Sequence, residues 1–167
     1  GRIIGHYRKS GNRLELEVTG VIGPGPNAQR TATSFFQDGQ YQERVFRSLE
    51  EQHPEIEHLG NWHTHHVNGL STLSSGDKAT YQRIVNHEKH NTDFFYAILV
   101  TEKTPRGSER YRAKHFILFR DNPRICEIPD SKIQVVDKPF MWPVDRATRV
   151  PARLHAAPTK VTTDSSH

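Results

Sequence analysis

The stretch at 56–77, IEHLGNWHTHHVNGLSTLSSGD, carries the clearest structural pattern in the 167-residue chain. Its first ten residues predict a strand that ends in His63-Thr64-His65, and residues two apart in a strand project from the same face. The turn signal Asn68-Gly69 follows, and Ser74-x-x-Asp77 has the form of a capping box at the start of a helix. We therefore expect a strand, a turn and a helix in succession.

The flanking sequence predicts that this unit belongs to one α/β domain at residues 1–138. Paired strands are predicted at 2–7 and 14–18, further strands at 31–36, 94–100 and 111–119, and amphipathic helices at 40–52 and 74–90. The run at 94–100 is continuously apolar, which is typical of a strand buried on both faces. Residues 139–167 are rich in Pro, Ala, Thr and Ser without periodicity, so an extended or flexible C-terminal tail is expected there.

Composition limits the classes of partner and compartment. The formal net charge is +4, but acidic and basic residues are interspersed, so a nucleic-acid partner is not expected. The single cysteine, Cys126, is predicted to be an inert strand residue; a chain without an internal disulfide fits a reducing compartment, and we expect a cytoplasmic protein. Because no apolar run approaches the roughly 18–20 residues of a membrane span, no membrane partner is expected either.

The chemistry-bearing residues predict a metal site. His63 and His65 share one face of their strand, and the first turn of the following helix can bring Asp77 over the strand end. Three such ligands leave a fourth position open for water, which distinguishes a catalytic zinc from a structural one. Each part also has a simpler explanation, because eleven histidines make a chance His-x-His pair plausible and Ser74-x-x-Asp77 alone is a helix cap. The combination favours a site. Four other histidines are expected to be exposed: His53, His58, His87 and His90.

At this point the sequence resembles the JAMM or MPN+ zinc metalloisopeptidases, whose motif is a Glu followed well downstream by His-Ser/Thr-His-Pro, a spacer and Ser-x-x-Asp. The resemblance implies a mixed curved β-sheet flanked by two main helices, with a cytidine-deaminase-like architecture. It also implies that His63, His65 and Asp77 bind Zn2+ and that Ser74 is the catalytic hydroxyl that stabilises the oxyanion. Trp62 stands just before the first histidine, where we expect core packing.

The sequence departs from that motif in three ways. His66 stands where the family usually has Pro, and one extra residue separates His65 from Asp77. The family's catalytic Glu lies on the first strand, just before a glycine-rich segment that residues 1–5 resemble, so the equivalent Glu is expected upstream of Gly1. Glu15 and Glu17 are the nearest substitutes, but their alternation with apolar residues predicts solvent-facing positions.

The function implied by the resemblance is zinc-dependent cleavage of isopeptide or peptide bonds at the C-terminus of ubiquitin or a ubiquitin-like protein. The implied partners are ubiquitin or a ubiquitin-like protein, the conjugates of that protein, and conjugation enzymes from the same operon in a prokaryotic relative. Zinc would activate a water molecule and polarise the scissile carbonyl. Two alternatives stay open: a non-catalytic MPN-like scaffold, and a zinc hydrolase acting on small peptides or sulfur-carrier precursors.

Overall fold

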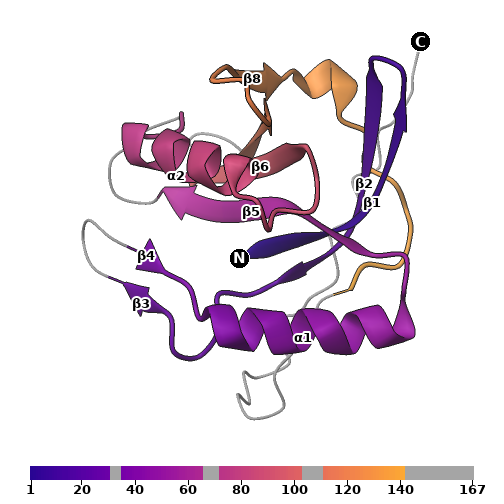
Figure 1. The fold of residues 1–167 in the computed structure, drawn as a ribbon, viewed down its shortest axis with the longest axis vertical. Coiled ribbons are helices and arrows are strands. Elements are labelled where there is room, and N and C mark those ends of the chain that lie inside the picture. The colour runs from indigo at the N-terminus through magenta and orange to yellow at the C-terminus, as the bar shows by residue number, and fades with distance from the viewer. Residues whose placement is uncertain (31–34, 66–71, 103–110, 142–167) are drawn as a thin grey trace.

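Strand β5 (Glu57–His65) lies inside a six-stranded mixed sheet, in which it is antiparallel to β1 and parallel to β6 (Figure 1). The computed structural model describes residues 1–30, 35–65, 72–102 and 111–141. The strand order is β2-β1-β5-β6-β7-β8. The other five strands of this sheet are β1 (Arg2–Ser10), β2 (Arg13–Ile22), β6 (Phe94–Glu102), β7 (Tyr111–Phe119) and β8 (Ile125–Ile128). The predicted α/β class is thus confirmed.

Helix α2 (Ser75–Asn86) connects the parallel strands β5 and β6, because parallel neighbours need a crossover connection. Tyr81 and Val85 of the helix join Phe95 and Leu99 of β6 in a buried cluster. The prediction that this helix continues to residue 90 is wrong. His87 already has an extended backbone, with φ −69° and ψ 136°, because the chain must turn back there to begin β6 at Phe94.

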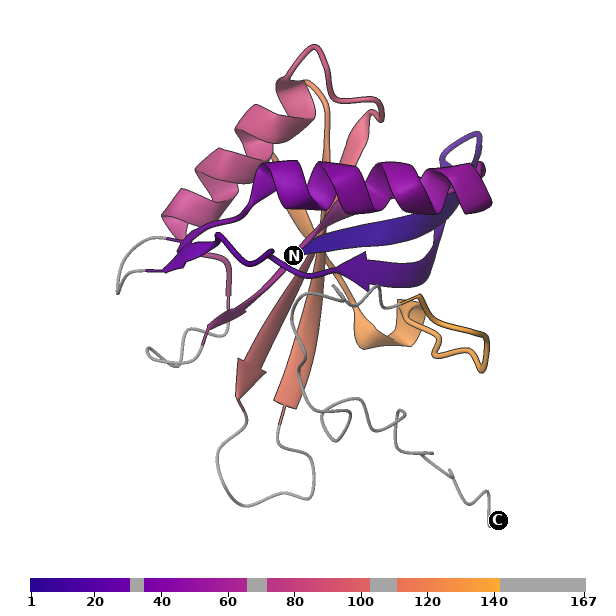
Figure 2. The same cartoon turned by 90° about the horizontal axis from the view of Figure 1, so that it is seen from below.

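Helix α1 (Gly39–Gln52) matches the predicted helix to within one residue, and Asp38 caps it by accepting a hydrogen bond from the backbone N–H of Tyr41. Its buried Tyr41 and Phe46 pack against Ile4 and Ile22. Since Ile3, Gly60 and Tyr96 are register partners and point to one face, Ile4 and Phe95 point to the other. Both helices therefore cover the same face of the sheet, and Figure 2 shows them lying together above the strands.

The opposite face of the sheet is closed by the sheet's own curvature. A buried cluster of Ile3, Leu59, Phe94 and Tyr96 lies there. Leu16 of β2 and Ile128 of β8 both pack against this cluster although they belong to opposite edges of the sheet, which requires the sheet to curl. Strand β6 contributes buried side chains to both faces, as its apolar run predicts.

The remaining elements are short. Strands β3 (Gln29–Arg30) and β4 (Phe35–Phe36) pair as a separate hairpin, while residues 31–34 of the predicted strand lie outside the described residues. A 3-10 turn, η1 (Asp130–Lys132), follows β8, which contains Cys126 as predicted. Met141 pairs with the β2 edge through its backbone, at 2.8 Å from Met141 N to Thr19 O and 3.1 Å from Val21 N to Met141 O.

Two further predictions concern the C-terminal tail and the membrane. The tail predicted at 139–167 lies mostly outside the described residues, which end at residue 141. Among the helices within the described ranges, none has the length and apolar character needed to cross a membrane.

Candidate metal centre

His63 and His65 lie at the carboxyl end of β5, on the face that α2 covers. Their register partners on β6 are Leu99, which packs against α2, and Thr101. The Nε2 atoms of His63 and His65 are 3.0 Å apart, and the ring centroids are 4.7 Å apart. The two imidazoles therefore present their Nε2 atoms to one place, as the spacing of two predicts.

Asp77 reaches the same place because of the cap at the start of α2. The backbone N–H of Asp77 donates to Ser74 Oγ at 3.1 Å, and the backbone N–H of Ser74 donates to Asp77 Oδ2 at 2.9 Å. This reciprocal cap fixes the carboxylate, whose Oδ2 lies 3.4 Å from His63 Nε2 and 3.3 Å from His65 Nε2. The cap and the candidate site are one arrangement rather than alternatives.

The three atoms have the spacing of ligands around a small tetrahedral ion. Zinc bonds of about 2.0–2.1 Å at tetrahedral angles place neighbouring ligand atoms about 3.3–3.4 Å apart. The observed separations are 3.0, 3.4 and 3.3 Å. Within the described ranges, His63, His65 and Asp77 form the group of three side chains able to hold a metal ion. Two imidazole nitrogens and one carboxylate oxygen suit Zn2+ and leave a fourth position for water.

The electrostatics favour an anionic ligand in a partly open site. Burial acts to raise the pKa of Asp77, but hydrogen bonds from His63 and from the Ser74 backbone and side chain outweigh it, so the pKa lies well below its usual range. Asp77 is therefore ionised at neutral pH. The side chains of His63, His65 and Asp77 are 16, 18 and 24% exposed, which leaves the rim accessible to solvent.

Tyr81 is a site residue that the sequence analysis did not predict. Its hydroxyl lies 2.9 Å from Nδ1 of His63, and its ring stacks on Phe95 with the centroids 4.9 Å apart. Burial and the negative charge of Asp77 raise the pKa of Tyr81, so the phenol is neutral. The available signal was spacing, because Tyr81 follows Asp77 by four residues and lies on the same side of the helix.

The other residues that the sequence analysis singled out near the motif are Ser74, Trp62 and His66, and they differ in position. Ser74 lies beside Asp77, and its oxygen accepts the hydrogen bond of the cap. Trp62 lies on the opposite face, where it packs against the cluster that contains Ile3 and Tyr96, in agreement with the core role expected for it. His66 falls outside the described residues.

Glu15 and Glu17 do not lie at the site. Glu15 forms ion pairs with Arg8 at 2.8 Å and Arg13 at 2.6 Å, and Glu17 pairs with Lys138 at 2.8 Å. Both residues are on the part of β2 that pairs with β1 near the hairpin turn, whereas β1 approaches the site only where Arg2 pairs with Asn61.

The remaining histidines are not all exposed, which corrects the prediction for His53, His58 and His90. His58 is half-buried, and burial together with the nearby charge of Arg2 lowers its pKa to about 4. The ring of His90 is also partly buried, and its Nε2 lies 2.8 Å from the carbonyl oxygen of Phe94. His53 is partly buried as well, and His87 is exposed, as predicted. The structure thus separates His63 and His65 from histidines with structural contacts.

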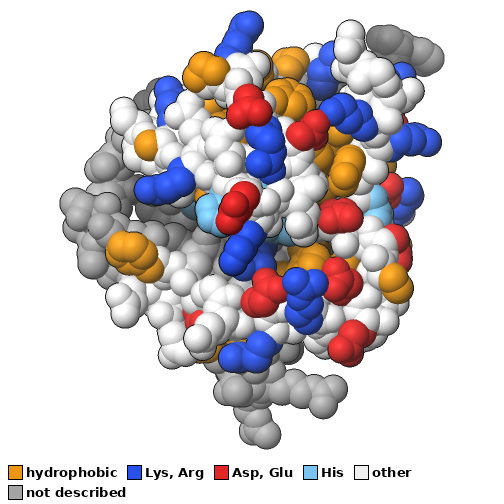
Figure 3. Space-filling view, viewed as in Figure 1, with side chains coloured by type: hydrophobic (Ala, Val, Ile, Leu, Met, Phe, Trp, Pro, Cys, Tyr) orange, Lys and Arg blue, Asp and Glu red, His pale blue; other side chains and the backbone are white. Residues whose placement is uncertain are grey.

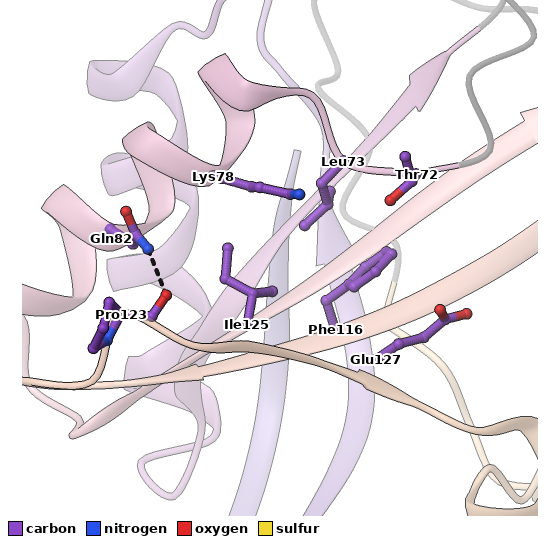
Figure 4. Close-up of a pocket in the computed structure, with 8 residues that line it drawn as sticks. All are labelled: Thr72, Leu73, Lys78, Gln82, Phe116, Pro123, Ile125 and Glu127. Carbon is purple, nitrogen blue, oxygen red and sulfur yellow. Dashed lines mark hydrogen bonds between the residues drawn. The ribbon is translucent and has the colours of Figure 1, made fainter.

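A pocket of about 360 Å³ lies between α2 and strands β7 and β8 (Figure 4). Leu73, Phe116 and Ile125 form its apolar lining, and Lys78 and Glu127 add charges. The pocket shares no lining residue with the metal cluster. Lys, Arg, Asp and Glu side chains are mixed over the face seen in Figure 3, without a continuous patch of one sign.

The fold and the geometry together define an α/β domain with three converging potential metal ligands at a strand end. No protein-family model and no curated protein matches this chain.

Proposed function

We propose that this chain is a JAMM-type zinc hydrolase, with an MPN-like fold, that cleaves isopeptide or peptide bonds at the C-terminus of ubiquitin or a ubiquitin-like protein. The observation that carries the proposal is the convergence of His63, His65 and Asp77 within tetrahedral ligand distances. The mixed curved sheet with two helices and the adjacent Ser74 are consistent with that class.

The residues of the site have separate roles in this proposal. His63 and His65 would hold the ion through neutral imidazole nitrogens, and Asp77 would add the negative charge that the cap keeps ionised. When bound, zinc supplies an activated water and a Lewis acid for the scissile carbonyl. Ser74 would turn its hydroxyl hydrogen from Asp77 to the developing oxyanion, a contribution of about 10²–10³ in rate. Neither Glu15 nor Glu17 is placed to take a proton from the activated water and pass it to the leaving amine.

The β3–β4 hairpin offers a docking surface for an extended substrate. It lies near the carboxyl end of β5 and the start of α2 in both views (Figures 1 and 2). The side chain of Phe36 on β4 is 65% exposed. An extended C-terminal tail, such as that of a ubiquitin-like protein, can add to a short edge strand through backbone hydrogen bonds. We therefore propose that the substrate tail enters along β4.

Metal analysis tests the proposal most directly. The purified protein should contain about one zinc per chain at neutral pH, and Asp77→Ala should lose it because the anionic ligand is removed. Asp93→Ala is the matched control, since Asp93 pairs with Lys9 on the surface and should leave the zinc content unchanged. A wild-type protein without stoichiometric zinc would favour the non-catalytic scaffold.

Cleavage assays distinguish the isopeptidase from the hydrolase of small substrates. A zinc-loaded protein extended upstream of Gly1 by residues that supply the general-base Glu should release the C-terminal partner from ubiquitin-like fusions. The same extended protein with Asp77→Ala should not. Hydrolysis of short peptides without cleavage of the fusions would reject the isopeptidase and favour a hydrolase of small substrates.

A further inference from the structure

His63 is held at both of its ring nitrogens. Its Nε2 faces His65 and Asp77, at 3.0 and 3.4 Å, and its Nδ1 lies 2.9 Å from the hydroxyl of Tyr81. A neutral imidazole has one N–H donor and one lone pair, and a nitrogen that binds a metal must use its lone pair. If Nε2 binds the ion, Nδ1 carries the hydrogen and needs an acceptor. The phenol oxygen of Tyr81 is in position to accept it.

Tyr81 is itself fixed by packing. The residue is 5% exposed and belongs to the buried cluster under α2, where its ring stacks on Phe95. It also follows Asp77 by one helical turn, so a single helix carries one ligand and the contact to another. A partner on a rigid helix can set both the orientation and the tautomer of the histidine that it contacts.

We propose that Tyr81 is a positioning residue that accepts a hydrogen bond from Nδ1–H of His63 and thereby presents Nε2 to a divalent cation. This inference rests on the proposed zinc function and adds to it a residue outside the motif. Metal-binding histidines usually donate their second N–H to a carboxylate, a backbone carbonyl or water. Here a neutral hydroxyl oxygen on the helix takes that place.

The chain contains a matched control on the other face of the sheet. Tyr96 is also 5% exposed, and its hydroxyl also bonds Nδ1 of a histidine, His115, with the two rings stacked at 5.9 Å. Tyr96 belongs to the cluster that contains Ile3 and Leu59, which is the face away from Asp77. Tyr81→Phe and Tyr96→Phe thus remove equivalent hydroxyl groups from equally buried rings.

Zinc affinity, measured by competition with a chromophoric chelator, tests the assignment without reference to catalysis. Tyr81→Phe should weaken binding by about 10–100-fold, the usual effect of losing such a partner. Tyr96→Phe should leave the affinity within about 3-fold of wild type, since its partner is not a proposed ligand. With Co2+ in place of zinc, the visible absorption spectrum should change in Tyr81→Phe and not in Tyr96→Phe. Equal affinities in all three proteins, or equal losses in both variants, would overturn the role of Tyr81.

A measurement on the wild-type protein keeps the test valid if Tyr81→Phe does not fold. Nitrogen-15 NMR of the zinc-loaded protein should show the hydrogen of His63 on Nδ1 and the metal on Nε2. The opposite tautomer would overturn the inference while leaving the zinc centre intact. A wild-type protein that binds no zinc would instead refute the proposed function itself, so the two failures are distinguishable.

Discussion

The two ends of β5 carry histidines on one strand with opposite surroundings. Near its start, Nε2 of His58 lies 2.9 Å from the carbonyl oxygen of Gly60 and 3.2 Å from Oδ1 of Asn61. A neutral ring with its hydrogen on Nε2 can donate to these two oxygens without any ion. At its end, the Nε2 atoms of His63 and His65 face each other and a carboxylate oxygen, and one cation can bind all three atoms. The neighbouring acceptors, more than residue type, separate a structural histidine from a candidate ligand.

The largest expected effect is on zinc content, when a histidine at either end of β5 is replaced by glutamine. His63→Gln should abolish stoichiometric zinc binding, because it removes a ligand nitrogen. His58→Gln should leave about one zinc per chain, because an amide can still donate to Gly60 and Asn61. Metal content after dialysis measures both. Equal zinc loss in the two variants would mean that the ends of β5 do not differ as described.

The next largest effect is a loss of folding stability at acid pH, caused by protonation of His58. Its folded pKa is about 4, below the ordinary histidine value of 6.5, so folding favours the neutral ring. The contribution of this group is complete above pH 6.5 and is lost as the pH falls from 6.5 to 4, by up to about 3 kcal/mol. Urea unfolding of metal-free protein at pH 7 and pH 4.5 should therefore show a smaller loss in His58→Gln than in wild type. His87→Gln, at an exposed position, should lose as much as wild type.

The smallest effect concerns the cap that brings Asp77 to the strand end. Ser74→Ala removes the acceptor for the Asp77 N–H and should lower the free energy of unfolding by about 1 kcal/mol. Ser74→Thr should keep most of that stability, and Ser75→Ala, at an exposed position in the first turn, should change it by less than about 0.5 kcal/mol. Chemical denaturation compares the variants, and an unaltered Ser74→Ala would contradict the contribution of the cap.

Local patterns explain how much of this molecule could be predicted. The shared face of His63 and His65 follows from strand geometry, and the cap at Ser74 and Asp77 follows from a four-residue motif. The same local reasoning placed α1 and the strand buried on both faces.

What could not be predicted depends on contacts between distant segments. The irregular register between β1 and β5, which occurs between Ile3 and Ile4, affects the part of β5 that contains His58, and no sequence spacing indicates it. The contact from Tyr81 to His63 joins residues 18 positions apart and depends on how α2 crosses the sheet. The predicted helix was too long because no Gly or Pro stands between Asn86 and Phe94 to mark its end, and the return to β6 decides that end instead.

One oxygen atom, Oδ2 of Asp77, receives the Ser74 backbone N–H and also faces both imidazoles. A carboxylate oxygen has room for more than one partner, so an arriving ion need not displace the amide. The anionic ligand is then anchored to the helix backbone instead of swinging on a free side chain. Such preorganisation lowers the entropic cost of capturing the ion, because folding has already fixed the position and orientation of that ligand.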